Sequence, residues 1–341
     1  MLRNLWIAAF LLVVSIVASA QQYKVSGKLS VPGEGTSWDY LVADSDNRIL
    51  YISHGTDVNV VDLDLEKPTT TIAGMKRIHG IALVNDLGRG FISDGGDNSV
   101  VIFDLKSNAV LQKVAVGSNP DGIVYDPSSK KVFAFNGKSK DVTVLDAATG
   151  KVLTTTPVGG KPEFPVADGK GSIYVNIEDT HEILLIDAGT AKVKTRWPMA
   201  ECEEPTGLAM DVSGRRLFSV CANKKMEVVD ADSGKIVATV PIGDGPDAVA
   251  YDAVRKLIVS SNGDDATLTV VHQDGPDKYT VLQNLATEKR ARTMALDQKT
   301  HKIYVPSAQM SPAAAPTAAD PKPRPKIVQG TFHVIVVSPG N

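Results

Sequence analysis

The chain has little of what marks a nucleic-acid-binding or membrane protein. Lys and Arg (36) nearly balance Asp and Glu (39), the formal net charge is −3, and there is no basic run. Such a chain offers no positively charged surface for a phosphate backbone, so its composition argues against a nucleic-acid partner. Only 2 of its 341 residues are cysteine, and apolar runs of membrane-spanning length are absent beyond residue 20.

The chain also lacks motifs of the common catalytic sites. It has no nucleophile elbow, no catalytic-triad spacing and no zinc motif. The segment "ATGK" ends at Lys151, but Leu145 stands where a phosphate-binding loop needs glycine. The segment "DADSGK", from Asp230 to Lys235, lacks the long loop and terminal Glu of an EF-hand. Both are typical of hairpin turns. Enzymatic activity is therefore left open, and a non-enzymatic role is favoured.

The first 20 residues differ from the rest. Arg3 supplies a positive charge, residues 5–17 are almost wholly apolar, and Ala18, Ser19 and Ala20 form an A-x-A-like cleavage site. This order predicts a secretory signal peptide rather than a membrane span. We therefore expect an exported protein, periplasmic or secreted, that is cleaved near Ala20. We expect a soluble monomer with no transmembrane segment in the mature chain.

What the chain does contain is repetition. "GSNPDGIVYD" ends at Asp126 and "GDGPDAVAYD" ends at Asp252, an interval of 126 residues or three times 42. Related units turn at Asp44, Asn85, Asp126, Asp168, Asp211, Asp252 and Asp297. Each unit has a two-residue period and a turn every eight to ten residues, which is typical of short antiparallel strands. Seven units of four strands predict an all-β fold, the seven-bladed β-propeller.

The two ends of the chain predict how the ring closes. Residues 23–35 read like the fourth strand of a unit, while the seventh unit has its third strand at 331–337 and no fourth. We expect the N-terminal strand to complete the last blade, which leaves no unpaired edge there. Residues 310–329 are too rich in Pro and Ala for regular sheet and predict a long loop in blade seven. Residues 21–341 then form a single domain.

The repeats resemble a known family. "SIYVNIEDTHEILLIDAGTAKV" and "NPDGIVYDPSSKKVFAFNGKSKDVTVLDAATGKV" are similar to the YVTN-type β-propeller repeat of YncE-like proteins. The family motif appears in degenerate form as "YVNI", "YVPS", "YISH" and "FAFN". The resemblance covers the whole mature chain. It implies the propeller fold and an exported bacterial protein, but it does not specify a ligand or reaction.

The cysteines fit this fold. Cys202 enters the inner strand of blade five, and Cys221 ends the antiparallel second strand, so the two ends of this hairpin meet. In an oxidising compartment this placement predicts a disulfide bond.

Propellers bind ligands at one mouth of the central channel. The loops that enter the inner strands share this face with the loops between the second and third strands. The turn residues above end the inner strands at the opposite face, where Asp favours turns. Counting five residues back from them predicts the mouth positions, which are Asp39, His79-Gly80, Asp121, Glu163, Thr206, Asp247 and Arg292.

Departures from the repeat are the better functional candidates. Asp121 and Asp247 belong to the repeated "PDG/PDA" phrase, whereas Glu163 lies in "KPEFPVAD", where Glu-Phe replaces Asp-Gly. Glu178 and Glu203 are expected near Glu163, and this cluster is either a ligand site or a solvated acidic rim.

Three further groups have alternative interpretations. His54 and His79, with nearby carboxylates, are candidates to hold a divalent metal. Trp38 either stacks on a ligand or packs as a lid. The Arg290 and Arg292 pair either clamps an anion or neutralises the acidic rim.

Two hypotheses follow. The first is an exported binding or interaction module whose channel mouth takes an unknown small ligand or protein partner. The second is a metal-assisted enzyme, a lactonase-like hydrolase or lyase that holds Ca or Mg. The candidate metal ligands are Glu163, Glu178, Asn136, Asn223 and Asn262. The wider ligand-binding set is Trp38, Asp39, His54, His79, Asp121, Glu163, Glu178, Glu203, Asp247 and Arg292.

Overall fold

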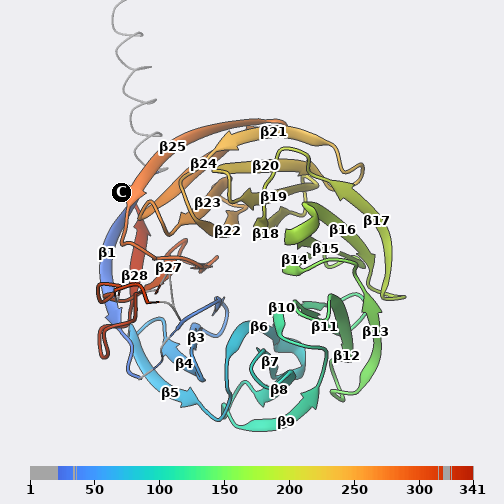
Figure 1. Cartoon of the computed structure of the whole chain (residues 1–341), viewed down its shortest axis with the longest axis horizontal. Coiled ribbons are helices and arrows are strands. Elements are labelled where there is room, and N and C mark those ends of the chain that lie inside the picture. The colour runs from blue at the N-terminus through green and yellow to red at the C-terminus, as the bar shows by residue number, and fades with distance from the viewer. Residues whose placement is uncertain are drawn as a thin grey trace, which may run out of the picture.

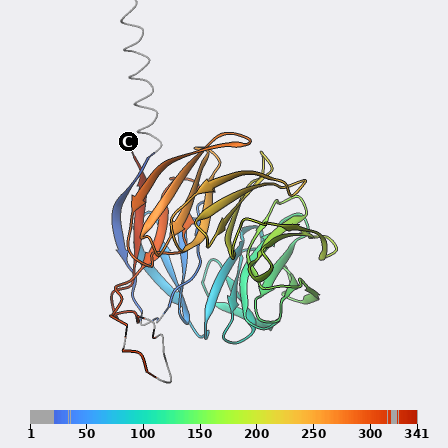
Figure 2. The same ribbon diagram turned by 45° about the horizontal axis from the view of Figure 1, so that its top comes forward.

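The computed structural model describes residues 22–33, 35, 37–313, 315–317, 323 and 325–340. Seven four-stranded antiparallel sheets are arranged around a central axis, as predicted (Figure 1). Figure 2 shows the same blades packed side by side in a tilted view. The predicted signal peptide, residues 1–20, lies outside the described residues. Neither of the short helices among the described residues is long and apolar enough to cross a membrane.

Each blade runs from an inner strand at the axis to an outer strand. Blade 1 contains β2 (Leu41–Asp44), β3 (Ile49–His54), β4 (Asp57–Asp62) and β5 (Lys67–Ile72). Blade 2 contains β6 (Ile78–Val84), β7 (Arg89–Asp94), β8 (Ser99–Asp104) and β9 (Val110–Ala115). Blade 3 contains β10 (Pro120–Asp126), β11 (Lys131–Asn136), β12 (Asp141–Asp146) and β13 (Val152–Pro157). Blade 4 contains β14 (Pro162–Ala167), β15 (Ser172–Ile177), β16 (Glu182–Asp187) and β17 (Lys192–Pro198).

The remaining blades follow the same order. Blade 5 contains β18 (Pro205–Asp211), β19 (Arg216–Cys221), β20 (Lys225–Asp230) and β21 (Ile236–Pro241). Blade 6 contains β22 (Pro246–Asp252), β23 (Leu257–Asn262), β24 (Thr267–Gly275) and β25 (Lys278–Ala286). Blade 7 contains β26 (Ala295–Leu296), β27 (Ile303–Ser307), β28 (His333–Pro339) and β1 (Tyr23–Ser30). Two short 3₁₀ helices are η1 (Asn85–Leu87) and η2 (Glu178–Thr180).

The position of a strand within its blade decides its burial pattern. In β11 and β12 nearly every residue is buried, whereas the outer strand β13 is mostly exposed. Both faces of the middle strands pack against neighbouring blades, so these strands are continuously apolar rather than alternating. The two-residue period expected from the sequence is therefore weakest in the middle strands.

The turn carboxylates join neighbouring blades at the face opposite the predicted mouth. Asp297 of blade 7 accepts a hydrogen bond from Arg48 of blade 1, with 2.7 Å between Oδ2 and Nη1. Asp168 of blade 4 pairs in the same way with Arg215 of blade 5 at 3.1 Å. Because these buried carboxylates also accept turn amides, as Asp168 does from Lys170 at 2.8 Å, they have a structural role.

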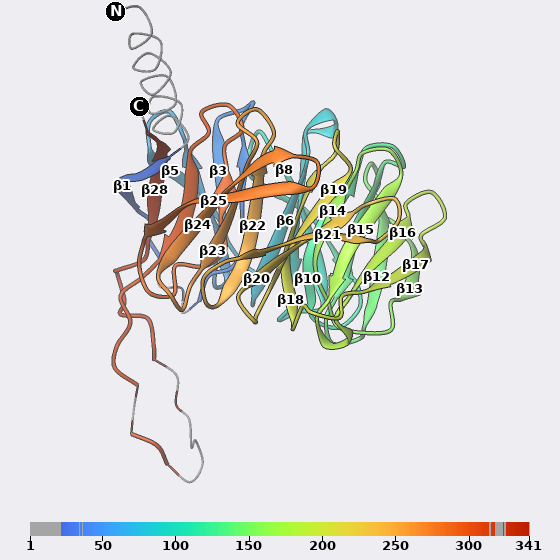
Figure 3. The same ribbon diagram turned by 90° about the horizontal axis from the view of Figure 1, so that it is seen from above.

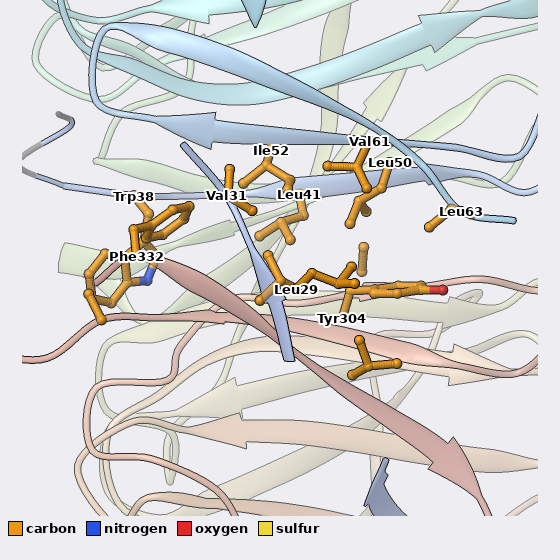
Figure 4. Close-up of a cluster of buried hydrophobic side chains, with 14 residues drawn as sticks. Leu29, Val31, Trp38, Leu41, Leu50, Ile52, Val61, Leu63, Tyr304 and Phe332 are labelled. Carbon is orange, nitrogen blue, oxygen red and sulfur yellow. The ribbon is translucent and has the colours of Figure 1, made fainter. Parts of the chain in front are cut away.

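The ring closes through its N-terminal strand, as predicted. β1 pairs antiparallel with β28 from Tyr23 opposite Pro339 to Ser30 opposite His333. Leu29 of β1 is buried in an apolar cluster with Tyr304 of β27 and Leu41 of β2 (Figure 4). The first and last blades therefore share one continuous core.

The predicted long loop lies between β27 and β28. Figure 3 shows that its described part extends away from the ring on the side opposite the C-terminal end of β28. Its base is held by a β-bridge between Met310 and Ile327 and by a hydrogen bond of 2.8 Å from Val328 N to Gln309 O. This side is also the side on which the inner strands begin, so the loop base lies beside the predicted mouth.

The predicted disulfide joins Cys202 to Cys221, whose Cα atoms are 5.2 Å apart. Cys221 ends β19, opposite Pro205 at the start of β18. Both cysteines are fully buried against the core between blades 4 and 5.

Candidate functional site

The channel mouth is defined here by the side chains at the entries to the seven inner strands. They approach one another because the inner strands leave little space at this level. At Gly122 in β10, a Cβ atom would come within 2.4 Å of the carbonyl oxygen of Glu163 in the next blade. Glycine is therefore required there, and the polar side chains before it are brought close together.

Asp39, His79 and Asp121 form a cluster contributed by blades 1, 2 and 3. His79 Nδ1 lies 2.5 Å from Asp39 Oδ2 and 3.7 Å from Asp121 Oδ1. The imidazole is buried, with 4% of the residue exposed, and its Nε2 atom has no hydrogen-bond partner among the described residues. Asp121 has no hydrogen bond to its carboxylate from any described residue, so its nearest partner is the imidazole at 3.7 Å.

The protonation of this cluster follows from its burial and its charges. Burial alone lowers the pKa of His79, but the hydrogen bond to Asp39 and the negative charge of Asp121 outweigh it and raise that pKa. Burial raises the pKa of Asp121 to about 6, although the nearby imidazole acts in the opposite direction. These interactions therefore favour the charged form of the imidazole, and Asp121 gains its proton near pH 6.

A second charged cluster lies beside it on blade 4. Lys161 Nζ lies 2.6 Å from Glu163 Oε1 and also contacts Glu178. Burial, together with a hydrogen bond to Glu178, raises the pKa of Glu163 well above its ordinary value. Burial also acts to raise the pKa of Glu178, but hydrogen bonds to Glu163 and Lys161 lower it overall. Lys161 therefore bridges two carboxyl groups that also share a hydrogen bond with each other.

Arg292 and Asp247 make the third charged contact of the mouth, between blades 7 and 6. The charge of Asp247 is the main cause that raises the pKa of Arg292, while burial raises the pKa of Asp247 despite the guanidinium. Arg292 Nη2 also donates to the carbonyl oxygen of Trp38 at 3.4 Å. Arg292 thus neutralises part of the acidic rim, one of its two predicted roles.

An aromatic pair crosses the axis below these charges. The rings of Tyr40 in blade 1 and Phe164 in blade 4 lie 4.8 Å apart between centroids, although the two blades lie on different sides of the ring (Figure 1). Burial and the charge of Glu163 raise the pKa of Tyr40 well above its ordinary value. The Glu-Phe departure in "KPEFPVAD" therefore supplies an apolar contact across the axis as well as a charge.

The two other candidate aromatic groups lie in the core. Trp38 is 5% exposed and packs against Phe332 with ring centroids 5.7 Å apart. The imidazole of His54 stacks on Phe332, with 3.9 Å between the ring centroids. Its Nδ1 atom lies 3.1 Å from Asn59 Oδ1. Burial lowers the pKa of His54. His54 does not join His79 in the mouth cluster, because its ring packs into the core of blades 1 and 7.

The predicted metal set is only partly assembled. Glu163 and Glu178 do come together, but the ammonium group of Lys161 lies between them. The amide nitrogens of Asn136 and Asn262 donate to Thr143 at 3.0 Å and Thr269 at 2.9 Å in their own blades. The group that the structure does assemble is Asp39, His79 and Asp121, whose possible ligand atoms all lie within 4.8 Å of one another.

The remaining two candidates lie on a loop of blade 5. Asn223 Oδ1 accepts a hydrogen bond from the backbone N–H of Glu203 at 3.3 Å, and its Nδ2 donates to Glu201 O at 2.8 Å. Glu203 is exposed. These contacts stabilise the loop. Both polar groups of the Asn223 side chain form hydrogen bonds with the backbone of this loop.

Sequence reasoning missed Lys161 and Tyr40 as parts of the mouth. Lys161 stands two residues before Glu163, a spacing that places both side chains on one face of an extended strand. That spacing is the one signal that identifies Lys161 beforehand. No comparable sequence signal identifies Tyr40, because its contact with Phe164 depends on the diameter of the ring of seven blades.

Comparisons with known proteins agree with the architecture. No protein-family model matches the chain, and no curated protein matches it. Among solved structures, a chain of hydrazine synthase from Kuenenia stuttgartiensis is similar, with 15% identity and a TM-score of 0.71. The match covers 81% of this chain and 94% of that chain. At this identity the likeness shows the β-propeller fold alone.

Proposed function

We propose that the protein is an exported binding module of the YVTN-repeat type that takes a small cationic ligand at its channel mouth. The observation that carries the proposal is Asp121. This carboxylate is largely buried, with 14% of the side chain exposed, and none of the described residues donates a hydrogen bond to it. His79 lies 3.7 Å away, beyond hydrogen-bond distance, so the carboxylate of Asp121 can still accept hydrogen bonds from a protonated amine supplied by a ligand.

The charge balance of the mouth supports the same ligand class. Five carboxyl groups meet three basic side chains there. Asp39 and Asp121 both lie near His79, Asp247 contacts Arg292, and Glu163 and Glu178 contact Lys161. The excess is therefore acidic, and an acidic concave site concentrates cations near its entrance.

Titration calorimetry of the purified mature chain with ethanolamine and putrescine tests the proposal. We expect binding at pH 8, at least a tenfold loss of affinity in Asp121→Asn, and no loss in Asp46→Asn. Asp46 is exposed in a turn at the opposite face, so the control changes the charge by the same amount. Equal amine affinity in both variants would overturn the proposal.

The alternative is a metal-assisted hydrolase or lyase, and the observation that favours it is the grouping of Asp39, His79 and Asp121. One imidazole nitrogen with two carboxylates suits zinc or manganese better than the Ca or Mg expected from the sequence. Elemental analysis of the protein as purified separates the two functions. Stoichiometric metal that is lost in His79→Ala would favour the enzyme, and metal-free protein that binds amines favours the binding module.

The exported location is part of this proposal. The support is the signal-peptide pattern of residues 1–20 together with the buried disulfide, which forms readily outside the cytoplasm. N-terminal sequencing of protein recovered from periplasmic and medium fractions is expected to begin near residue 21. A protein retained in the cytoplasm with its first residues intact would contradict it.

A further inference from the structure

A cleft lies between the base of the Pro-rich loop and the segment that precedes β26. Its volume is about 660 Å³. It is lined by Asp264, Glu288, Lys289, Arg290, Ala308, Gln309, Met310 and Pro325. A smaller adjoining cavity of about 70 Å³ shares Arg290, Met310 and Pro325 and extends to Trp38 and Arg292. The cleft is within the size range of small-molecule sites, and it lies beside the channel mouth.

The backbone of residues 288–293 is held in place beside this cleft, and Arg290 of this segment lines it. Ala291 is fully buried, and its N–H donates to Glu288 O at 3.0 Å, while Arg290 N donates to Gly263 O at 2.6 Å. Arg290 has a φ of 66° and Thr293 a φ of 58°, a left-handed conformation that is unfavourable for residues with a Cβ atom. The same conformation occurs at turn residues elsewhere in the ring, such as Lys256, so here it describes how the segment turns and does not by itself mark a ligand site.

The charges of the cleft are unequally satisfied. Glu288 forms an ion pair with Lys28 at 2.5 Å and lies 3.0 Å from His333 Nε2, and Arg292 contacts Asp247. By contrast, the side chain of Arg290 makes no hydrogen bond or ion pair with any described residue. Its Nε atom is buried from solvent without an acceptor. A buried guanidinium N–H without an acceptor is unfavourable, and an anion in the cleft would supply one.

Part of the lining of the cleft is apolar and held in place. Ala308, Met310 and Pro325 form this apolar wall, and Met310 packs against the core cluster that contains Trp38 and Phe332. The β-bridge of Met310 with Ile327 holds this wall in position. A bound molecule would therefore meet both a cationic group and a hydrocarbon surface.

We propose that this cleft binds an amphipathic organic anion, a carboxylate with an aliphatic body, through Arg290 and the wall formed by Ala308, Met310 and Pro325. Lys289, which is exposed, also lines the cleft and adds a second positive charge, while the carboxylate of Asp264 in the same lining disfavours an anion next to it. The site is separate from Asp121 and does not depend on the amine-binding function proposed above.

Titration calorimetry of the full mature chain with acetate, butyrate, hexanoate and octanoate at constant ionic strength tests this assignment. We expect affinity to rise roughly fourfold for each methylene group that the cleft buries. Arg290→Asn should weaken octanoate binding by roughly tenfold or more, because it removes a charge-assisted hydrogen bond while asparagine tolerates the left-handed backbone. Met310→Ser should flatten the dependence on chain length without changing acetate binding.

Lys256→Asn is the matched control. Lys256 has a φ of 54°, is exposed, and lies in the turn between β22 and β23 at the opposite face. This variant removes one positive charge from the same backbone conformation, and its octanoate affinity should equal that of the wild type. The midpoints of thermal unfolding of Arg290→Asn and Lys256→Asn verify that each variant is folded.

Three results would overturn the assignment. The first is an absence of octanoate binding, the second is an equal loss of affinity in Arg290→Asn and Lys256→Asn, and the third concerns Asp121→Asn. Asp121→Asn separates this site from the mouth, because it should leave octanoate affinity unchanged. An equal loss there would assign the anion to the mouth and refute a site at the cleft.

Discussion

Asp121→Asn should make the protein more stable at alkaline pH. The pKa of Asp121 in the folded chain is about 6, against an ordinary value of 3.8. Because the folded state binds this proton more tightly than the unfolded chain, the stabilisation is complete below pH 3.8 and is lost as the pH rises through 6. A shift of about two pH units corresponds to about 3 kcal/mol. Asparagine does not titrate, so the variant avoids this loss.

Urea denaturation between pH 4.5 and 8 measures the difference in the free energy of unfolding. We expect the variant to exceed the wild type only slightly at pH 4.5 and by up to about 3 kcal/mol above pH 7, with unchanged m values. A variant that is less stable than the wild type at pH 8, or a difference that does not change with pH, would refute the reasoning. Stabilisation together with lost amine binding is the behaviour of a residue kept for function.

Asp247→Asn is the control, since Asp247 occupies the same repeat position in blade 6. Asp247 contacts Arg292, and this substitution leaves the guanidinium without its counter-charge. The guanidinium opposes the rise in the pKa of Asp247, so we expect this substitution to stabilise the protein at pH 8 by less than Asp121→Asn does. Equal stabilisation by the two substitutions would mean that the contact with Arg292 does not offset the burial of Asp247.

Two further predictions concern the closure of the fold. Replacing both Cys202 and Cys221 by alanine should lower the free energy of unfolding by about 3 kcal/mol, because the disulfide bond joins residues 19 positions apart. Denaturation with and without reductant measures this loss. A double-alanine variant that reductant still destabilises would contradict the prediction. Leu29→Ala in β1 should cost about 2–5 kcal/mol because Leu29 is 6% exposed. Val25→Ala in the same strand, at a residue 41% exposed, should change stability by less than about 0.5 kcal/mol, and equal effects would mean that β1 does not close the core.

The fold could be predicted because each blade of a propeller is built from the same local sequence pattern. Each unit must form a hairpin, turn at an aspartate and bury apolar strands, and these signals recur near Asp126 and Asp252 with little drift. The position of β1 followed from counting strands, and the disulfide followed from the two ends of one hairpin. The alternation of apolar and polar residues is weakest in the middle strands, because both of their faces are buried.

The mouth could be predicted only as a set of positions. Counting back from the turns placed Asp39, His79 and Asp121 at one end of the axis, but it gave no way to pair them. The asparagines proposed as metal ligands were chosen for their location at strand ends. There, the nearest hydrogen-bond partners of Asn136 and Asn262 belong to their own blades.

The repeat period and the strand pattern by themselves determined the architecture of this protein, because interactions between near neighbours in the chain define each blade. Only the tertiary structure decided which charges meet. His79 and Asp39 are 40 residues apart, and Arg292 and Asp247 are 45 apart, so each pair crosses a blade boundary. Those contacts depend on ring diameter and strand twist, which local sequence does not encode. They leave Asp121 and Arg290 as the groups most suited to a ligand.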